Sequence, residues 1–98
     1  MTKGGIVKFQ WDRGNKDKNQ ERHQVTQEEA EAVFFDPKRR YYVDRKHSDK
    51  EQRFFVVGKT RLGRLLLVVY THRGKQIRII SARDLNKRKE GKYYEKAA

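Results

Sequence analysis

The chain has 98 residues, a length that suits one small domain with a thin hydrophobic core. Lys and Arg number 25 against 13 Asp and Glu, which gives a formal net charge of +12. The chain holds no cysteine, so disulfides and thiolate zinc sites are excluded, and it has no run of about 18 apolar residues for a membrane span. Its opening residues lack the apolar stretch of a secretion signal, so we expect a cytoplasmic protein.

The first part of the chain predicts one strand followed by two helices. Residues 6–11 are rich in the β-branched and aromatic types that strands favour. Asp12 can cap the turn that follows, and residues 13–23, polar on nearly all sides, are expected to be helical. A capping box, TQEE, occupies residues 26–29, and apolar residues follow it at helical spacing. This second helix should end just before Pro37, because the residue preceding a proline is disfavoured in helical geometry.

The second part of the chain predicts a β region. Strands are expected at residues 41–43, 52–58, 65–71 and 76–81, with a polar loop over 44–51. The strand from residue 65 is apolar almost throughout, which indicates cover on both faces. In the last strand, alternation places Ile77, Ile79 and Ser81 on one face and Arg78 and Ile80 on the other.

A basic segment, residues 85–96, predicts a final helix. Asn86 can cap it, and Gly91 inside it costs about 1 kcal/mol relative to alanine, which weakens or shortens the helix. The predicted fold class is therefore α+β, a small antiparallel sheet with two N-terminal helices and a C-terminal helix gathered on one side. We expect a single domain over the whole chain, with a flexible N-terminus at residues 1–5 and a frayed tail at 92–98.

The excess of basic charge is the strongest functional clue, because it attracts polyanions or an acidic protein. Arginine binds phosphate oxygens through a planar pair of donors and keeps its charge. Arg53 opens one predicted strand, Arg78 lies inside another and Arg83 follows it, so the three could bracket a phosphodiester. The alternative is structural ion pairs with nearby acids, which is the favoured interpretation for Arg53 alone and stays open for Arg78. The candidate partners are Asp44, Glu51 and Asp84.

Titratable side chains near these arginines suggest RNA cleavage by internal attack, which needs a base, an acid and cations for the developing charge. His47 in the polar loop can serve as acid or base, and Glu51 can serve as base. Taken singly, a histidine in a surface loop is usually inert. Tyr93 and Tyr94 could stack on bases or could dock the last helix on the sheet. The residues expected to contact RNA are Lys18, His23, Lys46, Arg88 and Tyr94.

Acids around His47 could suggest a metal site instead. Asp44, Asp49 and Glu51 share its loop, but four neighbouring cations oppose a dication. The chain also lacks the motifs of zinc proteases, EF-hands, phosphate loops and dinucleotide binding. We therefore expect no metal and no cofactor.

Residues that carry a family resemblance occur along most of the chain: Trp11-Asp12, Lys18-Asn19, residues 22–37, His47-Ser48, Glu51, Arg53, Gly58, residues 65–70 and residues 77–83. Over residues 9–95 the chain resembles the BrnT toxins of bacterial type II toxin–antitoxin systems. The resemblance implies a RelE-like ribonuclease fold and metal-free RNA cleavage that inhibits translation and growth. It also implies neutralisation by a BrnA-type antitoxin in a heterotetramer, which would contact operator DNA only through the antitoxin.

Two positions depart from the family pattern. Gln24 stands where the family usually has glycine, and Gly91 stands where it commonly has arginine. The first hypothesis is an endoribonuclease toxin whose catalytic residues are His47, Glu51, Arg53, Arg78 and Arg83. A non-catalytic basic module for RNA or DNA is the alternative, and a third hypothesis is a partner-binding protein whose catalysis has decayed.

Overall fold

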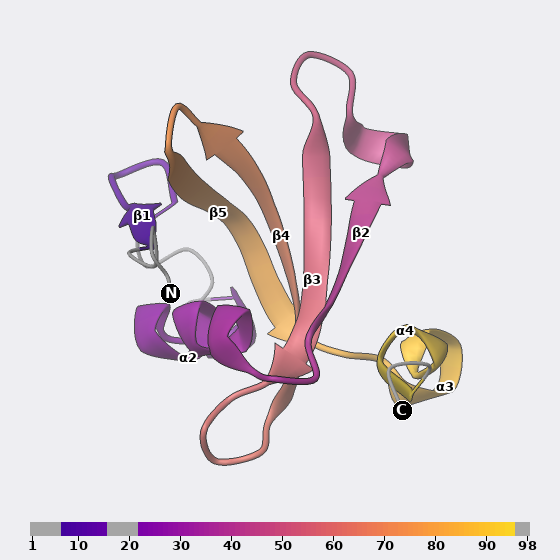
Figure 1. Cartoon of the computed structure of the whole chain (residues 1–98). Helices are drawn as coiled ribbons and strands as arrows, with labels where there is room; N and C mark the ends of the chain where they lie inside the picture. Colours follow the sequence, from indigo (N-terminus) through magenta and orange to yellow (C-terminus); the bar gives the residue numbers. More distant parts are fainter. Residues whose placement is uncertain (1–6, 16–21, 96–98) are drawn as a thin grey trace.

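One five-stranded sheet forms the centre of the molecule, described in this computed structural model over residues 7–15 and 22–95 (Figure 1). The strands are β1 (Lys8–Gln10), β2 (Arg40–Asp44), β3 (Arg53–Lys59), β4 (Leu65–Arg73) and β5 (Gln76–Asp84), in the spatial order β1-β5-β4-β3-β2. Strands β2 to β5 pair antiparallel, whereas β1 pairs parallel with β5. The expected antiparallel sheet is confirmed for four strands and is wrong for β1, which lies at the sheet edge.

Helix α2 (Gln27–Ala32) begins at the predicted capping box. The Thr26 hydroxyl accepts from the Glu29 amide at 3.1 Å, and the Glu29 carboxylate accepts from the Thr26 amide at 3.0 Å. A short 3-10 turn, η1 (Val33–Phe35), continues the helix, and the chain becomes extended at Asp36, directly before the proline. The helix expected over residues 13–23 falls largely outside the described residues, since 16–21 are not described; residues 13–15 form a turn, and Arg22 and His23 are helical.

The predicted C-terminal helix is divided in two. Helix α3 (Lys87–Glu90) is followed by a turn residue at Gly91 and then by α4 (Lys92–Glu95). The Asn86 side chain accepts from the amides of the second and third residues of α3 at 3.1 and 3.2 Å, which confirms it as the cap. In the described part of the chain, no helix has the length and apolar character needed to cross a membrane.

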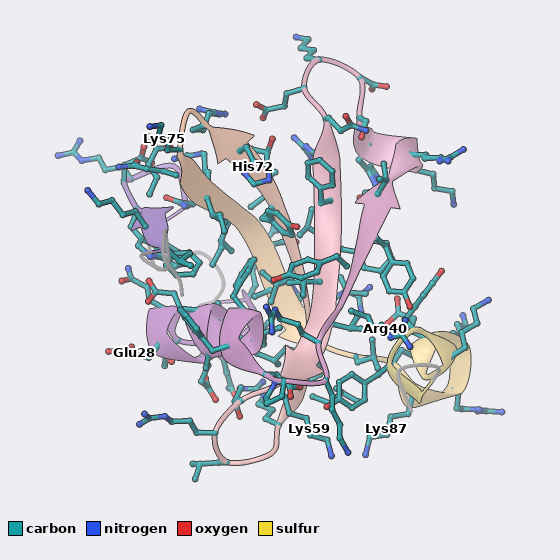
Figure 2. The ribbon with its side chains drawn as sticks, in the orientation of Figure 1. Glu28, Arg40, Lys59, His72, Lys75 and Lys87 are labelled. Atoms are coloured by element: carbon teal, nitrogen blue, oxygen red, sulfur yellow. The ribbon has the colours of Figure 1, made fainter. Side chains whose placement is uncertain are left out.

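Helices cover opposite faces of the sheet, so the expectation that they gather on one side is wrong (Figure 1). Successive residues of a strand point to opposite faces, and both faces of the central strands are apolar. Val56 packs in the cluster beneath α2 and η1, whereas its neighbour Val57 packs in a second cluster with Tyr93 and Tyr94 of α4. Charged side chains such as Glu28, Lys75 and Lys87 point outward from the edges, where Figure 2 labels them.

A β-bulge in β5 changes which side chains share a face. Val69 of β4 pairs with Ser81, but the next residue, Tyr70, pairs with Ile79, so Ile80 is the extra residue. Ile79 packs beneath α2, whereas Ser81 lies on the opposite face. The expected alternation, with Ser81 beside Ile79, is therefore wrong, because one inserted residue reverses the pattern.

Candidate active site

Side chains from four strands line up in rows on the sheet face opposite α2, because the strand register fixes which residues are neighbours. The rows lie about 6.6–6.8 Å apart along the strands, since each residue of a strand advances 3.3–3.4 Å. The two outer rows carry arginines, and the middle row is largely aromatic and apolar. Read from β2 to β5, two rows are Tyr42-Phe55-Val69-Ser81 and Arg40-Val57-Leu67-Arg83. The third consists of the pairs Asp44-Arg53 and Thr71-Arg78, which continue the β3–β4 register by one residue beyond its last pair, Phe54-Tyr70.

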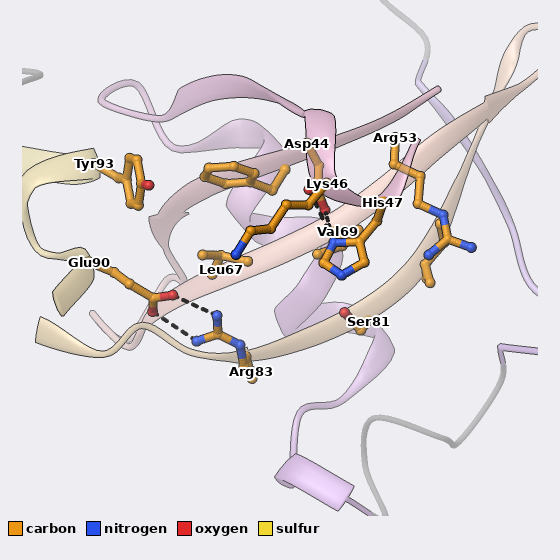
Figure 3. A pocket seen from close by; sticks show the side chains of 12 residues that line it. Asp44, Lys46, His47, Arg53, Leu67, Val69, Ser81, Arg83, Glu90 and Tyr93 are labelled. Atoms are coloured by element: carbon orange, nitrogen blue, oxygen red, sulfur yellow. Dashed lines mark hydrogen bonds and ion pairs between the residues drawn. The ribbon is translucent and has the colours of Figure 1, made fainter. Parts of the chain in front are cut away.

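A hollow of about 450 Å³ lies over these rows. The strands form its floor, the 3-10 turn η2 (Arg45–His47) forms one wall, and the α3–α4 corner forms the other (Figure 3). The sequence-predicted residues His47, Arg53, Arg83 and Lys46 all line it. These four side chains, from η2, β3 and β5, thus converge on one hollow.

His47 is held against Asp44, its neighbour three residues earlier. The Nδ1 atom of His47 lies 3.1 and 3.2 Å from the two carboxylate oxygens of Asp44. An ionised carboxylate can only accept hydrogen bonds, so Nδ1 carries the proton and Nε2 of the neutral ring keeps its lone pair. The histidine side chain is 64% exposed and the Asp44 side chain 15% exposed. This is the arrangement of a base that a carboxylate orients.

Ser48 fixes the loop that carries the histidine. Its hydroxyl donates to the Asp44 carbonyl at 2.6 Å and accepts from the Arg53 amide at 2.9 Å, so one side chain ties the end of β2 to the start of β3. The η2 turn between these strands therefore holds His47 beside the first arginine row.

Arg53 carries a donor without a partner. Its Nε atom is buried, and no hydrogen-bond acceptor among the described residues reaches it. An orphaned buried donor costs free energy unless a ligand satisfies it. The structural ion pair favoured for Arg53 is not formed by either predicted acid in the described chain, because Asp44 contacts His47 and Glu51 contacts Arg73. Arg53 is accordingly the guanidinium best placed to take an anion.

Arg83 is neutralised inside the hollow. Its two terminal nitrogens donate to the Glu90 carboxylate at 2.9 and 2.7 Å, a bidentate pair drawn as dashed lines in Figure 3. The Arg83 guanidinium lowers the pKa of Glu90, and the carboxylate in turn raises the pKa of Arg83. The carboxylate of Asp84, one of the three candidate partners of these arginines, instead binds Arg64 at 2.7 Å.

Arg78 lies on the same face as Arg53 but does not line the hollow. Its guanidinium binds Asp12 at 2.9 and 3.1 Å and the Gln10 side chain at 3.1 Å, and it is only 15% exposed. It lowers the pKa of Asp12 through these hydrogen bonds. The expected bracket of three arginines is thus realised for Arg53 and Arg83, while Arg78 fastens β1 and the turn after it to the sheet.

Glu51 occupies a shallower hollow of about 270 Å³ that also includes His47 and Arg53. Arg73 donates to both of its oxygens at 3.2 Å. These hydrogen bonds are the main reason why the pKa of Glu51 is lowered. A carboxylate with a lowered pKa is a weak proton acceptor, so the geometry favours His47 over Glu51 as base.

The remaining predicted RNA contacts do not line the main hollow, apart from Lys46, which extends into it from η2 (Figure 3). Tyr94 donates to Asp36 at 2.8 Å and its pKa is raised to about 12, by burial first and by that carboxylate second. It docks α4 on the sheet, as one interpretation of the sequence proposed. His23 lies near the start of α2 and Arg88 is exposed on α3, whereas Lys18 falls outside the described residues.

Among the polar residues of the hollow, Ser81 and Glu90 were not predicted as site residues, and Asp44 was named only as a possible ion-pair partner or metal ligand, whereas Tyr93 was named as a residue that could stack on bases. The partnership of Asp44 with His47 could have been found, because a spacing of three residues brings side chains together in a single turn. The sequence does not indicate the contact of Glu90 with Arg83, because that contact depends on the direction in which α3 leaves the end of β5. Within the described ranges, no three His, Asp or Glu side chains gather in a way that could hold a metal ion.

Comparisons with known proteins agree with this picture. The family model described as "Ribonuclease toxin, BrnT, of type II toxin-antitoxin system" matches residues 11–89. A search of curated proteins finds no match. The matched span includes His47, Arg53 and Arg83 and stops one residue before Glu90.

Proposed function

The chain belongs to the BrnT family of ribonuclease toxins of type II toxin–antitoxin systems, and from this membership we propose that it is an endoribonuclease that cuts RNA in the hollow of Figure 3 without a metal ion. The observation that carries the proposal is the histidine oriented by Asp44 at the mouth of a hollow that also holds the unpartnered guanidinium Nε of Arg53.

In the proposed mechanism, Nε2 of His47 takes the proton from a ribose 2′-hydroxyl. The 2′-oxygen attacks the adjacent phosphorus, a new P–O bond forms, and the bond to the 5′-oxygen of the next nucleotide breaks. Asp44 stabilises the imidazolium that results, since its carboxylate already holds Nδ1. Lys46 donates a proton to the departing 5′-oxygen. The products are a 2′,3′-cyclic phosphate and a free 5′-hydroxyl.

Positive charge at the hollow supports cleavage without a dication. The phosphorane-like transition state gains negative charge on its non-bridging oxygens, and fixed cations stabilise it most when they are already in position. Arg53 supplies such a cation from the strand floor, and Lys46 supplies one from η2. Arg83 stays paired with Glu90, so it adds a weaker field from the far side of the hollow. Glu51 and Arg78 contribute to the field around the hollow, and they take no proton in this scheme.

The proposal extends to the partner of the protein, its place of action and its fold relationship. As a type II toxin the protein has an antitoxin partner, and we propose that this partner is of the BrnA type, forms a heterotetramer with the toxin and alone contacts operator DNA. The proposed place of action is the cytoplasm, where the RNA substrate is found. The proposed fold relationship is RelE-like.

Cleavage of single-stranded RNA by purified protein in excess EDTA tests the proposal. Wild type should convert the RNA to fragments with cyclic phosphate ends. His47→Gln should lower the rate by about 10²–10⁴-fold, the range for loss of a general base. Asp44→Asn should lower it less, because the imidazole remains but loses its orienting charge.

Matched variants separate chemistry from charge and folding. His72→Gln removes an exposed histidine on the opposite sheet face, and Arg61→Ala removes an exposed cation far from the hollow, whereas Arg53→Ala removes the same charge inside it. Only the variants in the hollow should lose activity. RNA that is bound but never cut would establish the alternative, a non-catalytic binding module, and cutting that resists His47→Gln would remove the site assignment.

A further inference from the structure

The hollow has two chemically different halves. One half, near η2, holds the cationic and titratable groups Lys46, His47 and Arg53. The other half is apolar: Phe55 of β3 and Leu67 of β4 belong to its floor, and Tyr93 forms its wall. Figure 3 labels Leu67 and Tyr93 there. A charged phosphate gains no favourable contact from an apolar surface, so the second half suits a different, less polar part of an RNA ligand.

Aromatic rings of the apolar half are held rigidly. Tyr42 stacks on Phe55 with ring centroids 4.9 Å apart and planes 20° apart, and Tyr93 meets both rings edge-on at 4.9 and 5.2 Å. The Tyr42 hydroxyl donates to the carbonyl of Tyr93 at 2.7 Å, which fixes the wall to the floor through the backbone. A ring surface that is already in place loses little conformational entropy when a flat ligand binds.

Polar groups border this apolar half. Ser81 follows Phe55 and Val69 in the middle row, and its hydroxyl can donate or accept at the edge of a flat ligand. The Arg83–Glu90 pair closes the far side with both donors and acceptors. A flat, heteroaromatic ring with polar edges matches such a surface, whereas a sugar or a phosphate does not.

Resting on the proposed function, we propose that the apolar half is a subsite for one unpaired nucleobase of single-stranded RNA, next to the phosphate bound by Arg53. The base stacks on the rigid rings while its edge meets Ser81 and the Arg83–Glu90 pair. A base inside a duplex cannot enter, because its faces are covered by neighbours and its edge is paired. The subsite therefore selects single strands and positions the ribose of the bound nucleotide beside His47.

Binding of short, fully 2′-deoxy oligonucleotides tests the subsite separately from cleavage, because such strands lack the attacking hydroxyl. Fluorescence anisotropy with the wild-type protein compares an intact strand with strands that carry one abasic position each. Loss of the inserted base should weaken binding about 5- to 100-fold, as expected for one base–aromatic stack of about 1–3 kcal/mol. Because this comparison changes only the ligand, it involves no risk to folding.

Protein variants then locate the effect. Tyr93→Ala should bind intact and abasic strands alike, whereas Tyr93→Phe should keep the wild-type preference. Tyr41→Ala, which removes an exposed ring from the opposite face of the sheet edge, is the matched control and should leave the preference unchanged.

Each outcome decides between the two proposals. A base-dependent affinity without RNA cleavage would overturn the proposed nuclease and leave the subsite standing. Cleavage of RNA together with equal affinity for all abasic strands would overturn the subsite and leave the nuclease standing. A preference that survives Tyr93→Ala would place the base elsewhere and overturn the assignment to this hollow.

Discussion

Gln24 has a left-handed backbone, with φ of +56°, and it is the one described residue other than glycine with a positive φ. The loop cannot relax to a more favourable conformation, since both sides are anchored. Val25 is 2% exposed in the core, and Thr26 caps α2. Arg64 donates to the carbonyls of His23 and Gln24 at 3.1 and 2.8 Å. We therefore expect that Gln24→Gly stabilises the protein.

The size of the gain follows from two opposing terms. A left-handed conformation costs an ordinary residue about 1–2 kcal/mol because its Cβ approaches the following carbonyl oxygen. Glycine avoids that cost, but it gains freedom in the unfolded chain worth roughly 0.4–1 kcal/mol. The free energy of unfolding should therefore rise by about 0.5–1 kcal/mol. For a domain of this size the melting temperature would rise by roughly 2–8 °C.

Urea and thermal unfolding of three proteins measure this effect. Gln24→Ala is the control, because it removes the exposed side chain but keeps the Cβ. Wild type and the alanine variant should unfold at similar midpoints, and the glycine variant should unfold later with an unchanged slope against urea. An alanine variant as stable as the glycine variant would refute the claim that backbone geometry strains this loop.

Three further predictions concern charged and phenolic groups. Arg64→Ala should lower the free energy of unfolding by about 1–3 kcal/mol, since it breaks hydrogen bonds to two carboxylates and two loop carbonyls, and a change below about 0.5 kcal/mol in urea melts would contradict this. Arg83 lowers the pKa of Glu90, so the ion pair stabilises the fold above about pH 4.3, and this stabilisation is lost as the pH falls further. In Glu90→Gln, the free energy of unfolding should therefore depend less on pH in the acid range. Tyr70 and Tyr94 have pKa values raised to about 12, so they stabilise the fold below about pH 10 and lose this effect as the pH rises towards 12. Ultraviolet titration should show two phenols ionising late, and only one in Tyr94→Phe.

Local signals in the sequence predicted most of the secondary structure. The capping box at residues 26–29 and the proline after Asp36 predicted the start and the end of one helical segment correctly, because caps and prolines affect the backbone of adjacent residues. Strands β3 and β4 begin within one residue of their expected positions. Gly91 separates α3 from α4, as a glycine in a weak helix should.

Long-range features were predicted poorly. Helix placement on two faces depends on which apolar residues each strand turns outward, and the bulge at Ile80 altered that order without any local signal. The arginine partners depended on the fold, since Arg78 pairs with Asp12, 66 residues away in sequence, and Arg83 pairs with Glu90, 7 residues away, only because α3 turns back towards β5. Their positions in the sequence identified the candidate arginines, but only the folded sheet shows which of them form ion pairs with carboxylates and which do not.

The extra residue in β5 also determines where the end of the chain goes. Positions 78 and 83 differ by an odd number, so a regular strand would turn their guanidinium groups to opposite sides. Because the bulge absorbs one residue, Arg83 instead faces the same side as Arg78, and the segment that follows reaches the surface opposite α2. Deletion of Ile80 should therefore leave a regular strand that keeps Arg83 on this face, whereas a bulge-free pairing of the native residues would turn Arg83 under α2 and remove one wall of the hollow.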